Sequence, residues 1–125
     1  MDQKKDKVLI VDDESRNIFA LKAVLTAKGF SCISATTAEE GLQIASNQKD
    51  IGIILMDMML PQTDGYEAIS IIRKDPQLKE IPVIAVTAQA MKGDKEKCLN
   101  AGADNYISKP IDVDLLLNLL KLYLK

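Results

Sequence analysis

Short apolar runs alternate with helical periodicity along the whole chain, and this alternation constrains the fold more than any other feature of the sequence. Apolar or β-branched runs of about four to eight residues predict strands, whereas apolar residues spaced three and four apart predict amphipathic helices. Five strands that alternate with helices predict an α/β fold, with a parallel sheet and helices on both of its faces. The runs that predict strands are residues 7–11, 30–35, 51–56, 81–87 and 103–108. The first, third and fourth are the most continuously apolar, so we expect them at the centre of the sheet.

Several predicted helices have a recognisable start or end. Thr36 or Thr37 is typical of a helix N-cap, and the acidic residues that follow favour a first turn. Asp64 is likewise placed to cap a helix, which the Asp75-Pro76 pair would end. The first helical pattern ends at Gly29, the second ends near Asn47, and the third ends before Pro76. The last two helical patterns cover residues 91–102 and 111–124.

Composition and charge exclude several classes of protein. With 47% hydrophobic and 27% charged residues, the 125-residue chain suits a single domain over residues 1–125 with its core at 7–124. A net charge of −2 without a long Lys/Arg block predicts no direct contact with nucleic acid or with a membrane surface. The polar N-terminus is no signal peptide, and no apolar run reaches the ~18 residues of a spanning helix, so we expect a cytoplasmic protein.

The cysteines and the missing histidine narrow the chemistry further. Cys32 and Cys98 have no CxxC spacing, and a reduced pair is the plainer interpretation, with a disulfide as the alternative. The chain contains no histidine, which excludes a Ser-His-Asp triad and His-ligated zinc. Any chemistry must therefore use carboxylates, hydroxyls and lysines.

Polar residues that follow the predicted strands would meet at one edge of the sheet. Asp57 follows the third strand within the apolar stretch GIILMDMMLP, although carboxylates are rarely buried without a partner. Asp12 and Asp13 follow the first strand. The fourth strand ends in Thr87, and the fifth leads into Lys109. Ligands of open α/β sheets bind at the carboxyl ends of the strands, where these side chains would gather.

Each of these residues also has a purely local interpretation. Asp13 or Ser15 could cap the first helix, Thr87 could cap a later one, and Lys109 could be solvated. Together, however, the local interpretations require several independent coincidences and leave an acid at the end of a buried strand unexplained. A shared site is the stronger hypothesis.

Three clustered carboxylates suggest a particular chemistry. Such carboxylates repel one another, which raises pKa values unless a cation lies among them. A ligand set of oxygens without histidine or thiolate suits Mg²⁺, or Mn²⁺, and these ions also bind substrate phosphate. A carboxylate beside such an ion can attack a phosphoryl group and form an aspartyl phosphate. Lys109 and Thr87 would then stabilise charge on the phosphoryl oxygens.

With these residues placed, the sequence from Lys7 to Leu124 resembles the receiver domain of two-component response regulators. The resemblance is carried by VDDE (11–14), LMDMMLPQTDG (55–65), AVTA (85–88), AGADNYISKP (101–110) and the spacing between them. It implies the flavodoxin-like (βα)5 fold, a doubly wound parallel sheet with strand order 2-1-3-4-5. The stretch AVTAQAMKGDKEKCLNAGADNYISKPID is more similar to receivers attached to hybrid sensor kinases than to those of DNA-binding regulators.

The resemblance also implies roles for the acidic residues. Asp57 would be the phosphoryl acceptor. Asp12 and Asp13 would bind Mg²⁺ together with Asp57 and the main-chain carbonyl of Met59.

For the remaining site residues, the resemblance implies that Thr87 hydrogen-bonds the phosphoryl group and that Lys109 forms an ion pair with it. Tyr106 falls at the position of the aromatic switch residue, which turns inward when Thr87 moves. Members of the family typically have a cis bond at the position of Lys109-Pro110, although cis bonds are otherwise rare.

The implied function is signalling by a domain that catalyses its own phosphorylation and dephosphorylation, rather than an enzyme with a small substrate. The donor would be a phosphohistidine on a sensor histidine kinase or a histidine phosphotransfer domain. No effector domain accompanies the receiver in this sequence, so output would come from a partner, a relay or a longer parent chain.

The last predicted helix has a second apolar stripe. Leu115, Leu119 and Leu122 are spaced four and three apart, away from the face that should cover the sheet. One hypothesis is that this stripe contacts a partner, such as a phosphodonor domain, a second receiver or the rest of a parent chain. The alternative is burial against a neighbouring helix.

Two rival functions share the aspartate chemistry. A phosphatase or phosphomutase with an aspartyl-phosphate intermediate often has a second Asp two residues after the nucleophile, but Met59 stands there. A degenerate receiver that acts only as a binding module would be expected to lose an acid, the threonine or the lysine, and none is lost.

Overall fold

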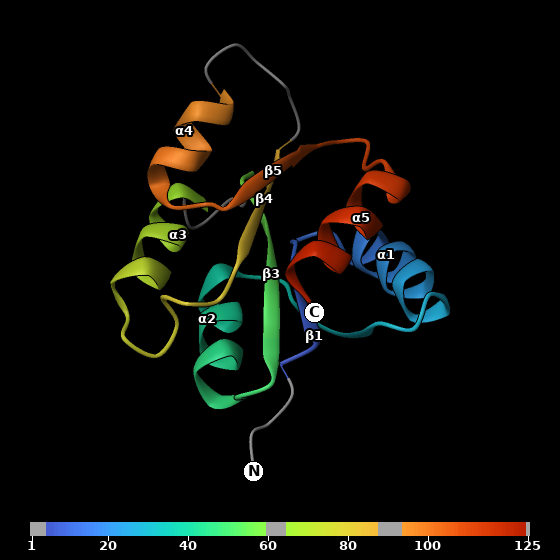
Figure 1. The fold of residues 1–125 in the computed structure, drawn as a ribbon, viewed down its shortest axis with the longest axis horizontal. Helices are drawn as coiled ribbons and strands as arrows, with labels where there is room; N and C mark the ends of the chain where they lie inside the picture. The colour runs from blue at the N-terminus through green and yellow to red at the C-terminus, as the bar shows by residue number, and fades with distance from the viewer. Residues whose placement is uncertain (1–4, 60–64, 88–93, 125) are drawn as a thin grey trace.

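A parallel five-stranded sheet with helices on both faces makes up the computed structural model, which describes residues 5–59, 65–87 and 94–124 (Figure 1). The strands are β1 (Lys7–Val11), β2 (Ser31–Ala35), β3 (Ile51–Asp57), β4 (Val83–Thr87) and β5 (Asn105–Ser108). The helices are α1 (Ser15–Ala27), α2 (Ala38–Asn47), α3 (Gly65–Lys74), α4 (Asp94–Ala101) and α5 (Val113–Tyr123).

The strand order is β2-β1-β3-β4-β5, with every neighbouring pair parallel. This confirms the fold class, the strand order and the central position of β1, β3 and β4. The central strands are the ones buried by helices on both faces, which is why they need continuously apolar sequences. β3 is buried at all seven positions.

Two of the predicted strands begin too early. β4 starts at Val83 rather than at residue 81, because the Ile81 N–H bonds to the Leu78 carbonyl in a turn and Pro82 has no N–H to donate. β5 starts at Asn105 rather than at 103, since the Ala103 N–H bonds back to the Cys98 carbonyl and closes α4. The helix predicted over 91–102 is observed from Asp94, and its first three positions lie outside the described residues. The predicted cap at residue 64 also lies outside them.

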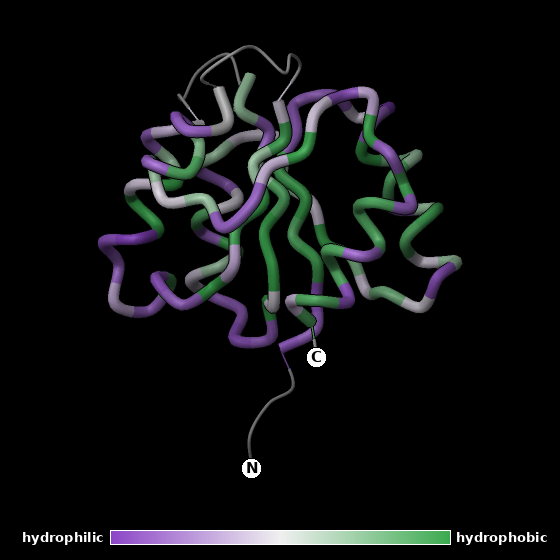
Figure 2. Tube along the Cα trace, turned by 45° about the horizontal axis from the view of Figure 1, so that its top comes forward, coloured by the Kyte–Doolittle hydropathy of each residue, from purple (hydrophilic) through white to green (hydrophobic). Residues whose placement is uncertain are grey.

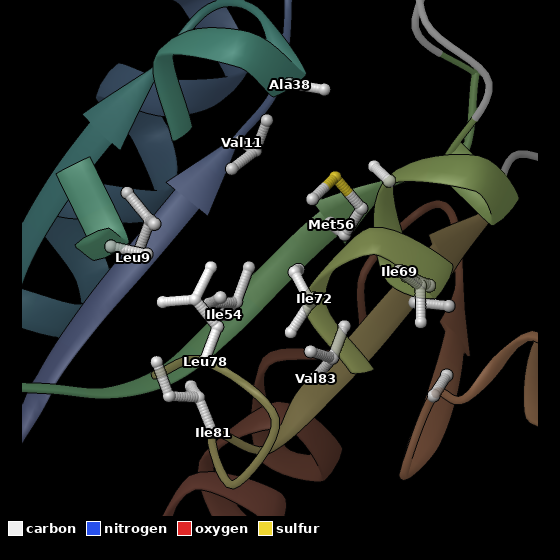
Figure 3. Packing of buried hydrophobic residues seen from close by; sticks show 14 of the residues in the cluster. Leu9, Val11, Ala38, Ile54, Met56, Ile69, Ile72, Leu78, Ile81 and Val83 are labelled. Carbon is white, nitrogen blue, oxygen red and sulfur yellow. The ribbon is translucent and has the colours of Figure 1, made fainter. Parts of the chain in front are cut away.

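The sheet separates two hydrophobic clusters. In Figure 1, α2, α3 and α4 cover one face of the sheet, and α1 and α5 cover the other. Side chains alternate between the two faces, so Leu9 and Ile54 belong to the first cluster, and Val8 and Ile53 to the second. Figure 2 shows the hydrophobic residues concentrated along the central strands. Figure 3 shows Ile72 of α3 lying against the strands of the first cluster.

Gly52 interrupts this alternation near the start of β3. Lys7 pairs with Ile51 and Val8 pairs with Ile53, so Gly52 is an extra residue between two registered positions. Such an irregularity reverses the side-chain alternation. A Cβ on Gly52 would overlap the carbonyl oxygen of Lys5 and would lie 2.5 Å from a methyl group of Leu124. The backbone at Lys5 can therefore approach β3 this closely only because residue 52 has no side chain.

The predicted cap of α2 is confirmed. The Thr37 hydroxyl accepts a hydrogen bond from the Glu40 N–H at 3.0 Å, and the Glu40 carboxylate accepts one from the Thr36 N–H at 2.8 Å. Cys32 and Cys98 are not joined to each other in a disulfide, as the plainer interpretation predicted. Within the described ranges, no helix is both long and apolar enough to cross a membrane.

Candidate functional site

Polar residues from four strands meet at the carboxyl edge of the sheet. The register pairs Val11 of β1 with Met56 of β3, so the next residues along the two chains, Asp12 and Asp57, are neighbours. On the other side of Asp57, Thr87 ends β4. The parallel arrangement thus brings residues that are far apart in sequence to one place, as the sequence analysis predicted.

Three carboxylates form the centre of this site. Oxygen atoms of Asp12, Asp13 and Asp57 lie within 4.8 Å of one another, close enough to hold one metal ion. Asp57 is 2% exposed and Asp12 is 8% exposed, whereas Asp13 is exposed to solvent. The cluster therefore has a buried floor and an open side. Its ligands are all oxygen atoms, the donor type that hard divalent cations prefer.

Asp57 is held by partners at both carboxylate oxygens. Oδ1 accepts a hydrogen bond from the Met59 N–H at 2.9 Å, and Oδ2 lies 3.4 Å from the Lys109 ammonium. Burial raises the pKa of the Asp57 carboxyl, and the neighbouring Asp12 adds to this. The Met59 N–H and the Lys109 charge act in the opposite direction without reversing the shift.

Lys109 links two of the acids to β4. Its ammonium lies 3.4 Å from Asp57 and 3.8 Å from Asp12, and its backbone N–H donates to the Thr87 carbonyl at 2.7 Å. The Lys109-Pro110 peptide bond is cis. Thr87 is 4% exposed, so the site includes a buried residue that carries a hydroxyl group. Lys109 supplies a positive charge where the acids would otherwise repel one another.

The local interpretations of Asp13, Ser15 and Lys109 do not hold. The N-cap of α1 is Glu14, with no side-chain capping bond, so neither Asp13 nor Ser15 caps it. The Asp12 carboxylate instead accepts a hydrogen bond from the Glu14 N–H at 2.9 Å. Lys109 is paired rather than simply solvated, while the residues that follow Thr87 lie outside the described part of the chain.

Met59 and Tyr106 are the remaining predicted site residues. Met59 directs its N–H to Asp57, while its side chain is 62% exposed. Tyr106 pairs with Ala85 across β4 and β5 and packs, partly buried, against the hydrophobic cluster beneath α3 and α4. It therefore lies on the strand next to β4, which Thr87 ends.

The second stripe of α5 is divided by the structure. Leu115 and Leu122 are 47% and 56% exposed, but Leu119 is partly buried and packs against the cluster beneath α1 and α5. Leu119 therefore agrees with the alternative of burial, whereas Leu115 and Leu122 remain exposed, as the hypothesis of a partner contact requires. The helix is rotated so that the middle of the stripe contacts the core.

An apolar pocket opens beside the carboxylates and was not predicted from the sequence. It has a volume of about 540 Å³ and lies between α1 and the segment from β5 to α5. The residues that line it are Asp12, Asn17, Ala20, Leu21, Val24, Lys109, Pro110, Ile111 and Val113. Phe19, on the same helix, is 77% exposed. Phe19 does not line the pocket, and a single exposed aromatic residue is ordinary on a protein surface.

Comparison with known proteins is consistent with this geometry. The chain is 39% identical over 117 residues to the polar-differentiation response regulator DivK of Brucella anthropi, covering 94% of each protein. The receiver domain of sensor histidine kinase PA1611 from Pseudomonas aeruginosa was crystallised with magnesium coordinated in its active-site cleft. It matches with a TM-score of 0.86 and 33% identity, covering 95% of this chain and 97% of that one.

A second similar structure is the co-crystal of the Saccharomyces cerevisiae histidine phosphotransfer protein Ypd1 with the receiver domain of Ssk1. It matches with a TM-score of 0.86 and 27% identity, covering 99% of this chain and 92% of that chain. The family model of the response regulator receiver domain matches residues 8–121. The chain therefore belongs to the response regulator receiver domain family.

Proposed function

We propose that this receiver domain accepts a phosphoryl group on Asp57 and changes its contacts with partners as a result. The observation that carries the proposal is a buried carboxylate surrounded by two further acids and a lysine, at the carboxyl edge of the sheet. An Asp57 oxygen attacks phosphorus, the bond from phosphorus to the donor breaks, and its electron pair leaves with the donor atom. The product is an acyl phosphate on Asp57.

Asp12, Asp13 and Asp57 would hold Mg²⁺, or Mn²⁺, with the main-chain carbonyl of Met59 as a further ligand. The spacing of the three carboxylates fits one hard cation. When bound, the ion neutralises charge on the acids and on the phosphoryl oxygens. Lys109 is already within reach of the Asp57 carboxylate and would pair with the phosphoryl group attached to it.

The donor would be a phosphohistidine on a sensor histidine kinase or a histidine phosphotransfer domain. The donor imidazole must approach the open side of the carboxylate cluster, and the apolar pocket beside Asp12 and Lys109 adjoins that side. The pocket offers an apolar surface that is continuous with the chemical site, because Asp12 and Lys109 are among the residues that line it. We infer that the donor domain docks there.

Thr87 and Tyr106 are proposed to carry the switch. Phosphorylation replaces a single carboxylate charge with roughly −1.5 to −2 charges, which biases the protein between two conformations. Thr87 is buried next to the site, and Tyr106 lies on the adjacent strand. The domain would catalyse its own phosphorylation and dephosphorylation, and would not be an enzyme that turns over a small substrate. Met59 has an exposed apolar side chain at the position where a phosphatase of this type carries an acid.

The proposed function predicts a covalent adduct that requires a divalent cation. Incubation with acetyl phosphate and Mg²⁺ should add ~80 Da, the mass of one phosphoryl group, in a base-labile linkage detected by intact mass spectrometry. Removal of the cation with EDTA should suppress the adduct, because the acids then repel the incoming anion. An unmodified chain in Mg²⁺ would contradict the proposal.

The proposed docking surface predicts different effects on two donors. Ala20→Asp places a charge in the pocket lining and should slow transfer from a phosphorylated histidine phosphotransfer domain at least ~10-fold, because an unpaired charge is costly to bury in an interface. Phosphorylation by acetyl phosphate should be unchanged, since this small donor needs no docking. The matched control is Ile71→Asp, an exposed apolar position on α3, on the opposite face of the sheet. Equal loss with both donors would contradict the docking proposal.

A further inference from the structure

The apolar pocket beside the carboxylates begins at a direct neighbour of the proposed phosphoryl acceptor. Lys109 lines the pocket, and its ammonium lies 3.4 Å from the Asp57 carboxylate. Asp12, another acid of the site, also lines it. The volume of about 540 Å³ falls within the range of small-molecule sites. The pocket therefore has room for part of a ligand that reacts at Asp57.

The α1 wall of the pocket is polar at the end near the site and apolar along the rest of its length. Asn17, Ala20, Leu21 and Val24 are spaced three and four residues apart, so they share one face of the helix. Asn17 lies in the first turn, close to Asp12, whereas Val24 lies about 10 Å further along the helix axis. A ligand that fills the pocket would therefore need a polar end at the site and an apolar end away from it.

The facing wall is formed by the segment that follows β5. Pro110, Ile111 and Val113 line the pocket directly after Lys109. Ile111 and Val113 are only half-buried, and Ala20 on the α1 wall is exposed. Apolar surface that water can reach is stabilised when an apolar group covers it. The pocket thus offers binding free energy to an apolar group of modest size.

A phosphodonor that matches both ends of the pocket carries its phosphoryl group on an apolar chain. The phosphoryl oxygens are negatively charged, which suits the Lys109 ammonium and a cation held by the acids. An acyl phosphate has this group at one end and an uncharged acyl chain at the other, which suits the apolar walls. Acetyl phosphate has a single methyl group to place there, so a longer aliphatic chain gains contacts that acetyl phosphate cannot make.

We propose that the pocket binds the acyl chain of small-molecule acyl phosphates and makes the domain selective for chains longer than that of acetyl phosphate. The inference rests on the proposed function, because the phosphoryl group still passes to Asp57. An Asp57 oxygen attacks phosphorus, and the bond between phosphorus and the bridging oxygen of the donor breaks. The electron pair of that bond leaves with the released carboxylate, which needs no proton. The small side chain of Ala20 leaves space for the acyl chain beside α1.

A comparison of butyryl phosphate with acetyl phosphate in Mg²⁺ tests this inference. Both donors release aliphatic carboxylic acids of nearly equal acidity, so their intrinsic reactivity toward a carboxylate is similar. The apparent second-order rate constant of adduct formation is measured by intact mass spectrometry at low donor concentration. We expect it to be about 10-fold higher for butyryl phosphate, because each buried methylene contributes roughly a factor of four. Equal rate constants would overturn this inference alone, whereas no adduct from either donor would overturn the proposed function with it.

Two substitutions in the pocket locate the preference. Ala20→Leu fills the space and Val24→Asp places a charge on the apolar wall, so each should bring the two rate constants close to each other. The matched control is Phe19→Ala, because Phe19 lies on the same helix, is 77% exposed and does not line the pocket. It should keep the ratio of the natural sequence. A preference that survives both pocket substitutions, or that is lost in Phe19→Ala, would overturn the assignment of the acyl chain to the pocket.

Discussion

Replacement of Asp57 by asparagine is expected to abolish the phosphoryl adduct formed with acetyl phosphate and Mg²⁺. An amide is not a nucleophile toward phosphorus, yet its oxygen can still accept the Met59 hydrogen bond, so the local backbone should be preserved. Intact mass spectrometry should show no gain of mass in the variant under conditions that fully modify the natural sequence.

Asp50→Asn is the matched control for this substitution. Asp50 makes an ion pair with Lys7 at 3.0 Å and lies at the start of β3, remote from the carboxyl edge. This variant should be modified like the natural sequence. Persistence of the adduct in Asp57→Asn would show that another residue accepts the phosphoryl group.

The same Asp57→Asn substitution is expected to raise the free energy of unfolding at pH 7. Burial raises the pKa of Asp57, so the folded state holds its proton more tightly than the unfolded state does. Stability is therefore lost as the pH rises from the ordinary carboxyl range through the raised pKa, and the loss is complete above it. The variant should be the more stable protein at pH 7 without Mg²⁺. The difference should shrink as the pH falls through the raised pKa, as measured by urea unfolding at several pH values.

Gly52→Val is expected to destabilise the fold by about 2–3 kcal/mol, the cost of overpacking a site that cannot relax freely. The first added carbon would overlap the backbone carbonyl of Lys5 and press on Leu124, and the strand that carries it is fully buried. Relief would require moving the N-terminal segment away from β3. Urea unfolding measured by circular dichroism should give this difference from the natural sequence.

The control for Gly52→Val is Ile53→Val on the same strand. It removes one methyl group from a fully buried side chain and should cost about 1 kcal/mol. If Gly52→Val cost no more than this control, the close approach of Lys5 would not constrain residue 52.

The sequence predicted the order and identity of the elements because each carries its own signal. β3 is continuously apolar up to Asp57, and it is buried at all seven positions. The starts of β4 and β5 were predicted two residues too early, since turn hydrogen bonds at Ile81 and Ala103 decide where pairing begins. Such bonds depend on how neighbouring elements are placed, which local composition does not encode.

The carboxylate site was predictable because parallel strands bring their carboxyl ends to one edge. Asp12, Asp57 and Lys109 are neighbours because each follows the carboxyl end of a strand, so their proximity follows from the strand order. The hydrogen bonds of the Arg73 guanidinium group were not predictable, because three of them go to backbone carbonyls that any residue would provide. Gly52 did carry a signal, since an isolated glycine in an apolar strand often marks an irregular pairing.

The rotation of α5 about its axis explains why its second apolar stripe is partly buried and partly exposed. The spacing of Leu115, Leu119 and Leu122 places them on one side of the helix, but the boundary between buried and exposed surface depends on how deeply the helix settles. Leu119 falls just inside that boundary and the other two fall outside it. Periodicity gives the direction of a face and not the depth of its burial.

The division of the interior into two clusters has a consequence for how such a domain can be altered. Among the described residues, none belongs to both clusters, so the proposed docking pocket beside α1 and the core beneath α3 and α4 lie on opposite sides of the sheet. The docking proposal therefore implies that substitutions lining the pocket would change the fit to a donor while leaving the packing beneath α3 and α4 as it is. β3, the strand that bears Asp57, contributes side chains to both clusters.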